Sequence, residues 1–362
     1  MSSNNRNAGR AAILNAPPGE PSNDLNSDGR FEMRPDGLFR RSDDGRPWRV
    51  SGPFEVLCET HDDEALAWGL LIRFPDRDQV TQCVVVTRDL FAGEGAELRG
   101  LLARRGLFVN PTQAARGALN LYLATLATPK RARVVARTGW HRVGDVRVFV
   151  LPDEVFGHAP VEVLYQPASR ELSPFRQAGS LAAWRDDVAS WCIGNSRLLL
   201  AVSAAFAAPL LDVVGEEGGG LHLRGASRIG KTTALRVAAS VWGGNVGGGA
   251  EAYLRQWRST SNATEGVAAT HSDTLLALDE LGQADPREVG ATAYMLASGQ
   301  GKNRMDRAGA LRAVARFRSL FLSTGELSLG YKIAEAGSAM KAGQEVRLVD
   351  LPADAGAGLG LF

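Results

Sequence analysis

A glycine-rich segment that runs into lysine and threonine limits the possible folds of this chain more than any other feature. It reads G-x-x-x-x-G-K-T from Gly225 to Thr232. Residues 221–224 before it alternate in polarity and predict a short strand. Apolar residues at helical spacing follow it, namely Leu235, Ala238, Ala239 and Trp242. A strand, a glycine-rich loop and a helix in this order are typical of a loop whose backbone N–H groups surround phosphates.

The spacing within this segment assigns a chemical role to each part of it. Nine residues are expected to bind a nucleotide: Gly225, Ala226, Ser227, Arg228, Ile229, Gly230, Lys231, Thr232 and Thr233. Lys231 is predicted to reach the β and γ oxygens, and the Thr232 hydroxyl to be a ligand of Mg²⁺. The helix that follows directs its positive end at the same anion. The expected cofactors are therefore ATP and Mg²⁺.

An acidic pair follows the next buried strand. Residues 274–278 are a continuous apolar run, which favours a strand covered on both faces of a parallel sheet, and Asp279 and Glu280 come directly after it. Carboxylates at that end of a strand lie where such sheets bind ligands. We expect Asp279 to hold Mg²⁺ and Glu280 to polarise the attacking water, which a hydrolase needs and many kinases do not. The alternative is a surface Asp-Glu pair that caps a helix.

A third strand is predicted at residues 320–322, and polar side chains follow it. Thr324 is the expected contact for the γ-phosphate or the attacking water, with Ser323 almost equally suitable. Between these two strands, residues 285–288 combine an N-cap, a proline and a capping-box acid, which predicts a helix from Asp285 to about residue 298.

A basic segment precedes the third strand. Residues 299–318 carry six basic side chains against one acid, for a local charge of +5. The whole chain has 41 Lys and Arg and 40 Asp and Glu, a net charge of +1, so overall charge does not indicate a polyanion partner. A local patch does, because neutralised phosphates release counterions. Lys302, Arg304 and Arg307 are the predicted nucleic-acid contacts, and a solvated basic loop is the alternative.

Length and patterning predict two domains. The chain has 362 residues, more than a domain with one ordinary hydrophobic core contains, and 44% of them are apolar. Residues 1–28 are polar and lack bulky apolar side chains, which predicts a disordered tail. Residues 29–170 should form a smaller, strand-rich α+β domain. Residues 171–362 should form an α/β domain with a parallel sheet and flanking helices, and this domain should begin with a helical collar at residues 181–192 and 196–211.

Cysteines and hydropathy bear on localisation. The three cysteines are unevenly spaced and form no C-x-x-C motif, which argues against a disulfide framework or a zinc site. The longest apolar stretch, residues 198–211, is shorter than the roughly 20 residues that a membrane helix needs. No secretory signal pattern occurs at residues 1–28. We therefore expect a cytoplasmic protein that has no membrane partner.

Several motifs, in order along the chain, resemble one bacterial helicase-like family, the domain of unknown function 927. These motifs are T-G-W-H at 138–141, G-N-S-R at 194–197, L-R-G-A-S-R-I-G-K-T-T-A-L at 223–235, L-D-E-L-G-Q at 278–283, G-Q-G-K at 299–302, L-S-T-G-E at 322–326 and G-Q-E-V-R-L-V-D-L-P at 343–352. Such domains resemble the P-loop ATPase parts of phage and plasmid primase-helicases, which are ring-forming members of the AAA+ group. The resemblance implies an AAA+/RecA-like sheet, a homo-oligomer such as a hexameric ring, and a primase partner.

The resemblance also implies that Arg347 is an arginine finger for a neighbouring subunit, while a surface salt bridge is the ordinary alternative. The apolar residues Val346, Leu348 and Leu351 predict a strand around it. The leading functional hypothesis is an ATP-dependent helicase or translocase that acts on single-stranded nucleic acid, DNA in the first instance, during replication of a phage, plasmid or other mobile element. The alternative is a nucleotide-dependent loader or assembly module that does not unwind. A P-loop kinase is a more distant third.

Overall fold

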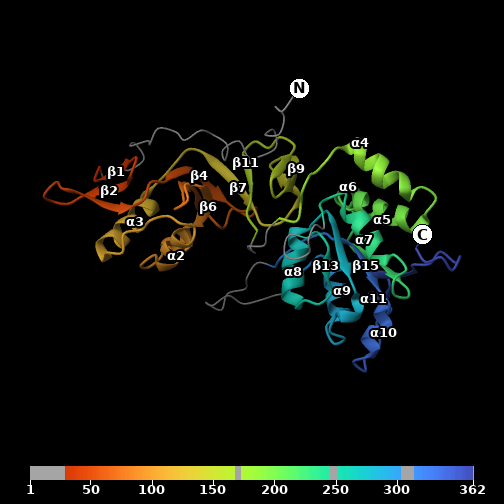
Figure 1. Cartoon of the computed structure of the whole chain (residues 1–362). Coiled ribbons are helices and arrows are strands. Elements are labelled where there is room, and N and C mark those ends of the chain that lie inside the picture. The colour runs from red at the N-terminus through yellow and green to blue at the C-terminus, as the bar shows by residue number, and fades with distance from the viewer. Residues whose placement is uncertain (1–28, 168–172, 245–251, 303–313, 362) are drawn as a thin grey trace. The chain divides into compact units, whose positions relative to one another are not determined.

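The computed structural model describes residues 29–167, 173–244, 252–302 and 314–361 (Figure 1). The predicted tail, residues 1–28, lies outside the described residues. The described chain divides into two compact units. The first contains the residues up to Val135 together with Arg142–Val148 and Asp153–Gln166, and the second contains Ala136–His141, Phe149–Pro152 and the residues from Pro167 onward. In the described part of the chain, no helix is both long and apolar enough to cross a bilayer.

The first unit is built mainly from strands. Three of them form an antiparallel sheet in the order β1-β2-β3, and five form a mixed sheet in the order β11-β7-β4-β5-β6. Their bounds are β1 Phe31–Arg34, β2 Gly37–Arg41, β3 Pro47–Ser51, β4 Glu55–His61, β5 Gly69–Pro75, β6 Thr81–Thr87, β7 Arg131–Val135 and β11 Glu162–Tyr165.

Two helices complete the core of this unit. They are α2 (Ala96–Arg104) and α3 (Gln113–Thr125), and a 3₁₀ helix covers Arg88–Phe91. Leu98 and Leu102 on α2 and Leu119 and Leu123 on α3 are fully buried, at the i, i+4 spacing that places side chains on one face of a helix. They pack with alternate residues of β5 in one apolar cluster. A further small sheet has the order β10-β9-β8, with β8 Gly139–Val143, β9 Val146–Leu151 and β10 Glu154–Phe156.

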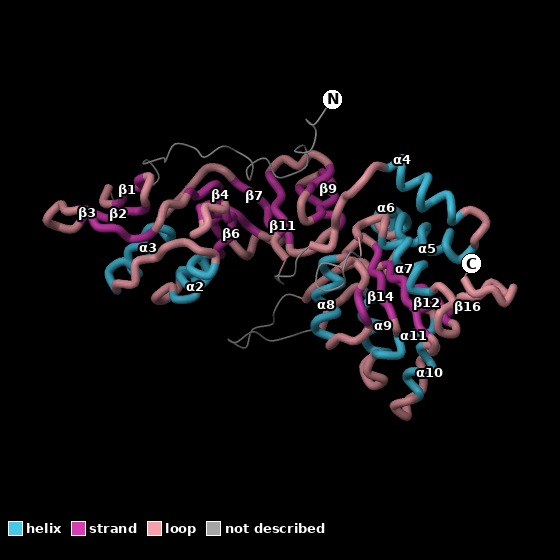
Figure 2. Tube along the Cα trace, in the orientation of Figure 1, coloured by secondary structure: helices cyan, strands magenta, loops and turns pink. Residues whose placement is uncertain are grey.

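The second unit contains a parallel sheet of five strands in the order β13-β14-β15-β12-β16. Figure 2 draws strands in magenta and labels β12, β14 and β16 of this sheet. The bounds are β12 Gly219–Arg224, β13 Arg255–Gln256, β14 Leu275–Asp279, β15 Leu320–Gly325 and β16 Leu348–Pro352. All four neighbouring pairs are parallel. The carboxyl ends of the strands therefore meet at one edge of the sheet, which is where open α/β sheets bind ligands.

Helices cover both faces of this sheet. Their bounds are α4 Leu181–Trp184, α5 Ser196–Ala207, α6 Leu210–Val214, α7 Lys231–Ala239, α8 Ser261–Thr270, α9 Val289–Ser298, α10 Leu329–Ala334 and α11 Ala342–Glu345. Leu275 and Ala277 of β14 pack in an apolar cluster with α5 and α7. Leu276 and Leu278 pack in a second cluster with α8 and α9. This alternation explains the continuous apolar run in the sequence, because both faces of β14 are buried.

Two predicted helices differ from the observed ones. The helix predicted from Asp285 begins instead at Val289, so the predicted start is wrong. The Asp285 carboxylate accepts the N–H of Arg287 at 2.8 Å, which closes a turn ahead of the helix and leaves no side-chain cap on α9. The helix predicted over residues 181–192 changes type: α4 passes into a π-helix at Arg185–Ala189 and a 3₁₀ helix at Ser190–Cys192.

Candidate functional site

The glycine-rich loop connects β12 to α7 at the carboxyl edge of the sheet. The N–H of Gly225 donates to the carbonyl of Gly325 at 3.1 Å, which ties the loop to the end of β15. Gly230 adopts φ 98° and is the N-cap of α7. Arg228 adopts φ 62°, a left-handed conformation that costs energy for a residue with a side chain. The loop therefore holds a shape that its own residues do not prefer.

The ammonium group of Lys231 lies inside this loop. The side chain is largely buried, and Nζ donates to the carbonyl of Gly225 at 2.9 Å and to that of Ala226 at 2.5 Å. An ammonium has three donors, so one remains for another acceptor. Lys231 is thus held at the first turn of α7, next to the amide groups at its positive end.

Three side chains converge on the ends of α7, β14 and β15. The Thr232 hydroxyl donates to the carboxylate of Asp279, at 3.1 Å from Oδ2 and 3.3 Å from Oδ1. The Thr324 hydroxyl donates to Oδ1 of the same carboxylate. The structure therefore brings together three residues that are 45 or more positions apart in the sequence, with Asp279 in the middle.

Glu280 lies beside this cluster and has an unusual backbone. Its φ of 60° is left-handed, and its N–H donates to the Thr324 hydroxyl at 3.4 Å. Partial burial raises the pKa of Glu280, and the negative charges of Asp279 and Glu326 raise it further, while Lys231 acts in the opposite direction. A carboxyl group with a raised pKa is a stronger proton acceptor once it is ionised.

Ser323 lies outside the cluster. Trp257 donates its indole N–H to the Ser323 hydroxyl at 2.8 Å, and Nδ1 of His222 lies 2.9 Å from the same oxygen. Nε2 of His222 lies 2.9 Å from the carbonyl of Leu327, which can only accept, so Nε2 carries the proton and Ser323 donates to Nδ1. Of the two polar residues that the sequence offers here, Thr324 faces the acidic pair and Ser323 faces the buried histidine.

The oxygen donors of this cluster suit magnesium. The Asp279 carboxylate and the Thr232 hydroxyl are hard oxygen ligands, and Mg²⁺ in nucleotide sites takes one or two such groups together with phosphate and water. Among the described residues, no group of three or more His, Cys, Asp or Glu could hold a metal by itself. A site of this composition fits an ion that arrives with a phosphate ligand.

The predicted nucleic-acid contacts are only partly described. Lys302 is exposed, and its backbone N–H donates to the buried Glu265 carboxylate at 3.3 Å. Gln300 pairs with Arg316 in an antiparallel bridge, so the two flanks of the basic segment run side by side. Arg304 and Arg307 lie outside the described residues. The structure thus places Lys302 at the end of a short antiparallel stem and leaves the other two predicted contacts unplaced.

Arg347 lies at the amino end of the sheet, away from the carboxyl ends of the strands where the cluster lies. It immediately precedes β16, whose first residue pairs with Gly220 near the start of β12. Its guanidinium lies 4.5 Å from the ring centroid of Tyr294 and donates to the carbonyl of Gly343 at 3.0 Å. The predicted strand around it begins only at Leu348, and Val346 is exposed, so the apolar side expected there is wrong in part.

A buried carboxylate that the sequence did not indicate, Asp273, organises the amino end of the sheet. It precedes β14 and is 2% exposed. The guanidinium groups of Arg137 and Arg318 lie 3.3 Å and 3.4 Å from its oxygens. The backbone N–H of Trp140 donates to it at 3.0 Å. At Gly139, where φ is +91°, a Cβ atom would come within 2.3 Å of this carboxylate, which explains the glycine next to Trp140.

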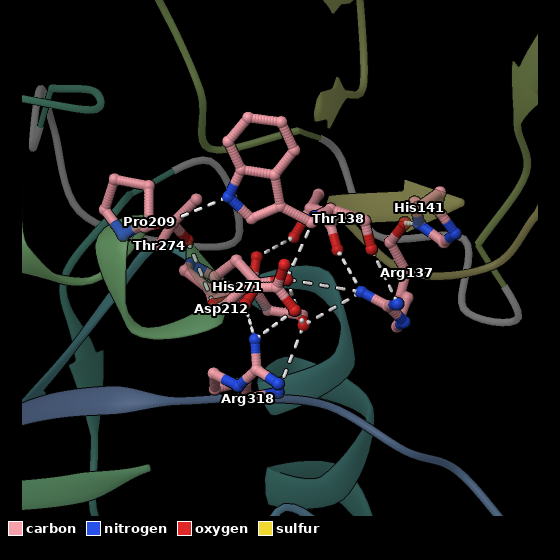
Figure 3. A network of polar contacts seen from close by, with 11 residues as sticks. Arg137, Thr138, His141, Pro209, Asp212, His271, Thr274 and Arg318 are labelled. Atoms are coloured by element: carbon pink, nitrogen blue, oxygen red, sulfur yellow. Dashed lines mark hydrogen bonds and ion pairs between the residues drawn. The ribbon is translucent and has the colours of Figure 1, made fainter. Parts of the chain in front are cut away.

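His141, the last residue of the T-G-W-H motif, is buried beside this network. Its Nε2 lies 3.0 Å from the carbonyl of Arg137 (Figure 3). It therefore stabilises the turn at residues 137–141.

Comparisons with known proteins give a family and a shared fold. A solved structure described as "SCCmec type IV Cch - active helicase" matches with a TM-score of 0.68 and 20% sequence identity, over 91% of this chain. The match spans 59% of that longer chain, and at this identity it shows a shared fold. No curated protein sequence matches significantly. The family model described as "Domain of unknown function (DUF927)" matches residues 31–316, most of the sequence, and the chain belongs to that family.

Proposed function

We propose that the chain is an ATP-dependent helicase-like or translocase-like ATPase that acts on single-stranded nucleic acid. The observation that carries this proposal is the cluster of Thr232, Asp279 and Thr324, with Lys231 and Glu280 beside it, at the carboxyl edge of a parallel sheet. The similar fold of a protein described as an active helicase supports the nucleic-acid part of it. The setting in replication of a phage, plasmid or other mobile element is proposed from the family resemblance.

Each residue of the cluster has a distinct task in this proposal. The loop amides and Lys231 bind the phosphates of ATP, and Thr232 and Asp279 hold Mg²⁺. When bound there, Mg²⁺ would supply positive charge that neutralises the phosphates. Glu280 orients a water molecule and accepts its proton, for which its raised pKa is suited. Thr324 fixes both acidic residues, because its hydroxyl donates to Asp279 and accepts the Glu280 N–H.

Arg347 completes the site only from a second copy of the chain. It lies at the amino end of β16, so the length of a strand separates it from the acidic pair of its own subunit. A five-residue strand spans about 16 Å, which exceeds the reach of an arginine side chain. We therefore propose a homo-oligomer, a hexameric ring in the family pattern, in which Arg347 serves the neighbouring site.

The decisive experiment compares Glu280→Gln with Glu217→Gln. Glu217 is exposed and precedes β12, at the edge opposite the cluster. Glu280→Gln should bind ATP normally and lose about 10²–10⁴-fold in turnover, because general-base assistance has that magnitude. Glu217→Gln should hydrolyse ATP at the wild-type rate. Undiminished hydrolysis by Glu280→Gln would remove Glu280 from this role.

Strand displacement separates the motor from the loader hypothesis. A motor should hydrolyse ATP faster with single-stranded DNA and should unwind a forked duplex. A loader should bind ATP and change its oligomeric state without unwinding. The measurement is ATPase activity and strand displacement over a range of protein concentrations, since a site shared between subunits makes specific activity depend on concentration.

A further inference from the structure

Residues 353–361, here named the glycine hook, lie against the glycine-rich loop. At one end of the hook, the N–H of Ala353 donates to the carbonyl of Arg224 at 2.7 Å, directly before the loop begins. At the other end, the N–H of Leu361 donates to the carbonyl of Ile229 at 2.9 Å. The hook therefore spans the loop from Arg224, the residue before it, to Ile229, the residue before Gly230.

The carboxylate of Asp354 gives the hook its shape. Its oxygens accept the N–H groups of Gly356 at 2.6 Å, Gly358 at 3.2 Å and Gly360 at 2.9 Å. The three glycines have φ values of +103°, +73° and +76°, which residues with a Cβ rarely adopt. These hydrogen bonds hold the pKa of Asp354 below its usual range. The Asp354 carboxylate thus acts as the internal anchor of the hook.

Leu361 is fixed from two sides. It is 2% exposed and packs in the apolar cluster that includes Ile229 and Leu198. Its carbonyl accepts the Asn195 side-chain N–H at 2.6 Å, and the Asn195 oxygen caps the first turn of α5. Helix α5 packs against α7. The hook therefore connects the loop to the helical layer beneath it.

The contact with Ile229 determines how the loop is oriented. In a trans peptide, the C=O and the following N–H point in opposite directions. Because the Ile229 carbonyl points at the hook, the N–H of Gly230 points away from it. The adjacent Arg228 holds a left-handed φ of 62°, which would relax without outside support. The hook holds the next residue, Ile229, through the N–H of Leu361.

We propose that the glycine hook is a brace that keeps the loop in its nucleotide-binding shape, with Asp354 and Gly360 as positioning residues. The inference rests on the proposed function, because it concerns how well the loop binds a nucleoside triphosphate. The hook follows β16, whereas the acidic pair lies at the end of β14, and two strands separate β14 from β16 in the sheet. Loss of the brace should therefore weaken ATP binding and leave the turnover of bound ATP nearly unchanged.

The test substitutes glycines of matched backbone conformation. At Gly360, a Cβ would lie 3.0 Å from Cβ of Ile229, whereas Gly337, at φ +73°, has nothing within 4 Å. Gly337→Ala therefore reports the cost of a left-handed alanine alone. Binding of N-methylanthraniloyl-ATP with Mg²⁺ gives the dissociation constant. If the competent loop falls to about a tenth of the population, this constant rises about tenfold in Gly360→Ala. Gly337→Ala should stay within about twofold.

A second series covers the case in which Gly360→Ala does not fold. Asp354→Ala removes the anchor, and Asp354→Asn keeps one oxygen acceptor. Affinity should fall in the order wild type, Asn, Ala, while circular dichroism stays unchanged and kcat at saturating ATP stays close to wild type. A rise in KM without a matching fall in kcat distinguishes positioning of the loop from general damage.

The outcomes separate the two proposals. If wild-type protein does not bind the fluorescent nucleotide, the proposed function fails. If wild-type protein binds it and folded Asp354→Ala binds it equally well, the brace fails and the proposed function stands. Equal losses in Gly360→Ala and Gly337→Ala would likewise overturn the brace.

Discussion

The Thr324 hydroxyl donates a hydrogen bond to the Asp279 carboxylate, and this bond joins the ends of two adjacent parallel strands. Because Thr232 donates to the same carboxylate, a change at the end of β15 can reach the first turn of α7 through one side chain. Ser323, the neighbouring residue, takes part in a separate buried network with His222 and Trp257. Two adjacent hydroxyl groups thus serve different purposes.

These two hydroxyls predict different phenotypes. Thr324→Val removes the hydroxyl at constant volume and should lower kcat by about a hundredfold, with a stable fold, because misplaced catalytic groups have effects of that size. Ser323→Ala should leave turnover of the folded enzyme nearly intact. It should lower the free energy of unfolding by about 1–3 kcal/mol, since the Trp257 N–H loses its acceptor. Steady-state kinetics and urea titration give both quantities. The reverse pattern would exchange the two assignments.

The acidic side of the pH profile of ATP hydrolysis should shift when the charge of Glu326 is removed. The negative charge of Glu326 contributes to the raised pKa of Glu280. Glu326→Gln removes that charge, stabilises the ionised form of Glu280 and so lowers its pKa. Hydrolysis needs the ionised form, so the rise of kcat/KM with pH should begin at a lower pH than in wild type. The exposed Glu217→Gln provides the control, and an unshifted limb would rule out this coupling.

Arg347 should act between subunits. Arg347→Ala should bind ATP and lose about 10³–10⁵-fold in turnover, the usual contribution of an arginine finger. Lys231→Ala should fail to bind ATP. When the two variants are mixed, some intact sites of the Arg347→Ala subunit will face an intact arginine of the Lys231→Ala subunit. ATPase activity should therefore appear in the mixture. An inactive mixture that forms mixed oligomers would indicate that Arg347 is only the partner of Tyr294.

The basic segment should contribute to the salt dependence of single-strand binding. Lys302→Ala with Arg304→Ala should weaken binding and reduce the slope of log K against log salt by about 0.7 for each phosphate that is no longer neutralised. Fluorescence anisotropy with labelled oligonucleotides at several salt concentrations measures this slope. Arg46→Ala is the control, since Arg46 is highly exposed and belongs to the first unit. An unchanged slope would mean that Lys302 and Arg304 are solvated and do not contact phosphates.

Asp273 should contribute strongly to stability. Asp273→Ala leaves Arg137 and Arg318 without their shared partner and should lower the free energy of unfolding by about 3 kcal/mol. Asp350→Ala breaks an exposed ion pair with Arg224 in the same unit and should cost less than about 1 kcal/mol. Urea titration of the two variants makes the comparison. Similar midpoints would mean that the Asp273 network is largely hydrated.

The sequence predicted the order of elements around the candidate site well, because each had a strong local signal. The apolar run of β14 is buried on both faces, and the glycine-rich loop lies between a strand and a helix as expected. The start of α9 was wrong because the Asp285 side chain closes a local turn, which has the same composition as a helix cap. Local patterns identify elements better than they locate their boundaries.

The sequence did not predict which residues far apart in the chain contact one another. The position of β15 between β12 and β14 depends on sheet order, which periodicity does not encode. The roles of Asp273 and the glycine hook depend on interactions with distant segments, such as those of Asp273 with Arg137 and Leu361 with Asn195. The glycine next to Trp140 was the available signal in the sequence. A glycine is compatible with a close approach but does not identify the partner.

The antiparallel bridge between Gln300 and Arg316 has a practical consequence for engineering. The stem fixes both attachment points of the intervening residues independently of what they are. Sequences of other lengths and charges should therefore be exchangeable at this point without altering the parallel sheet. Under the proposed function, chimaeras made there should change single-strand binding and leave ATP binding in place.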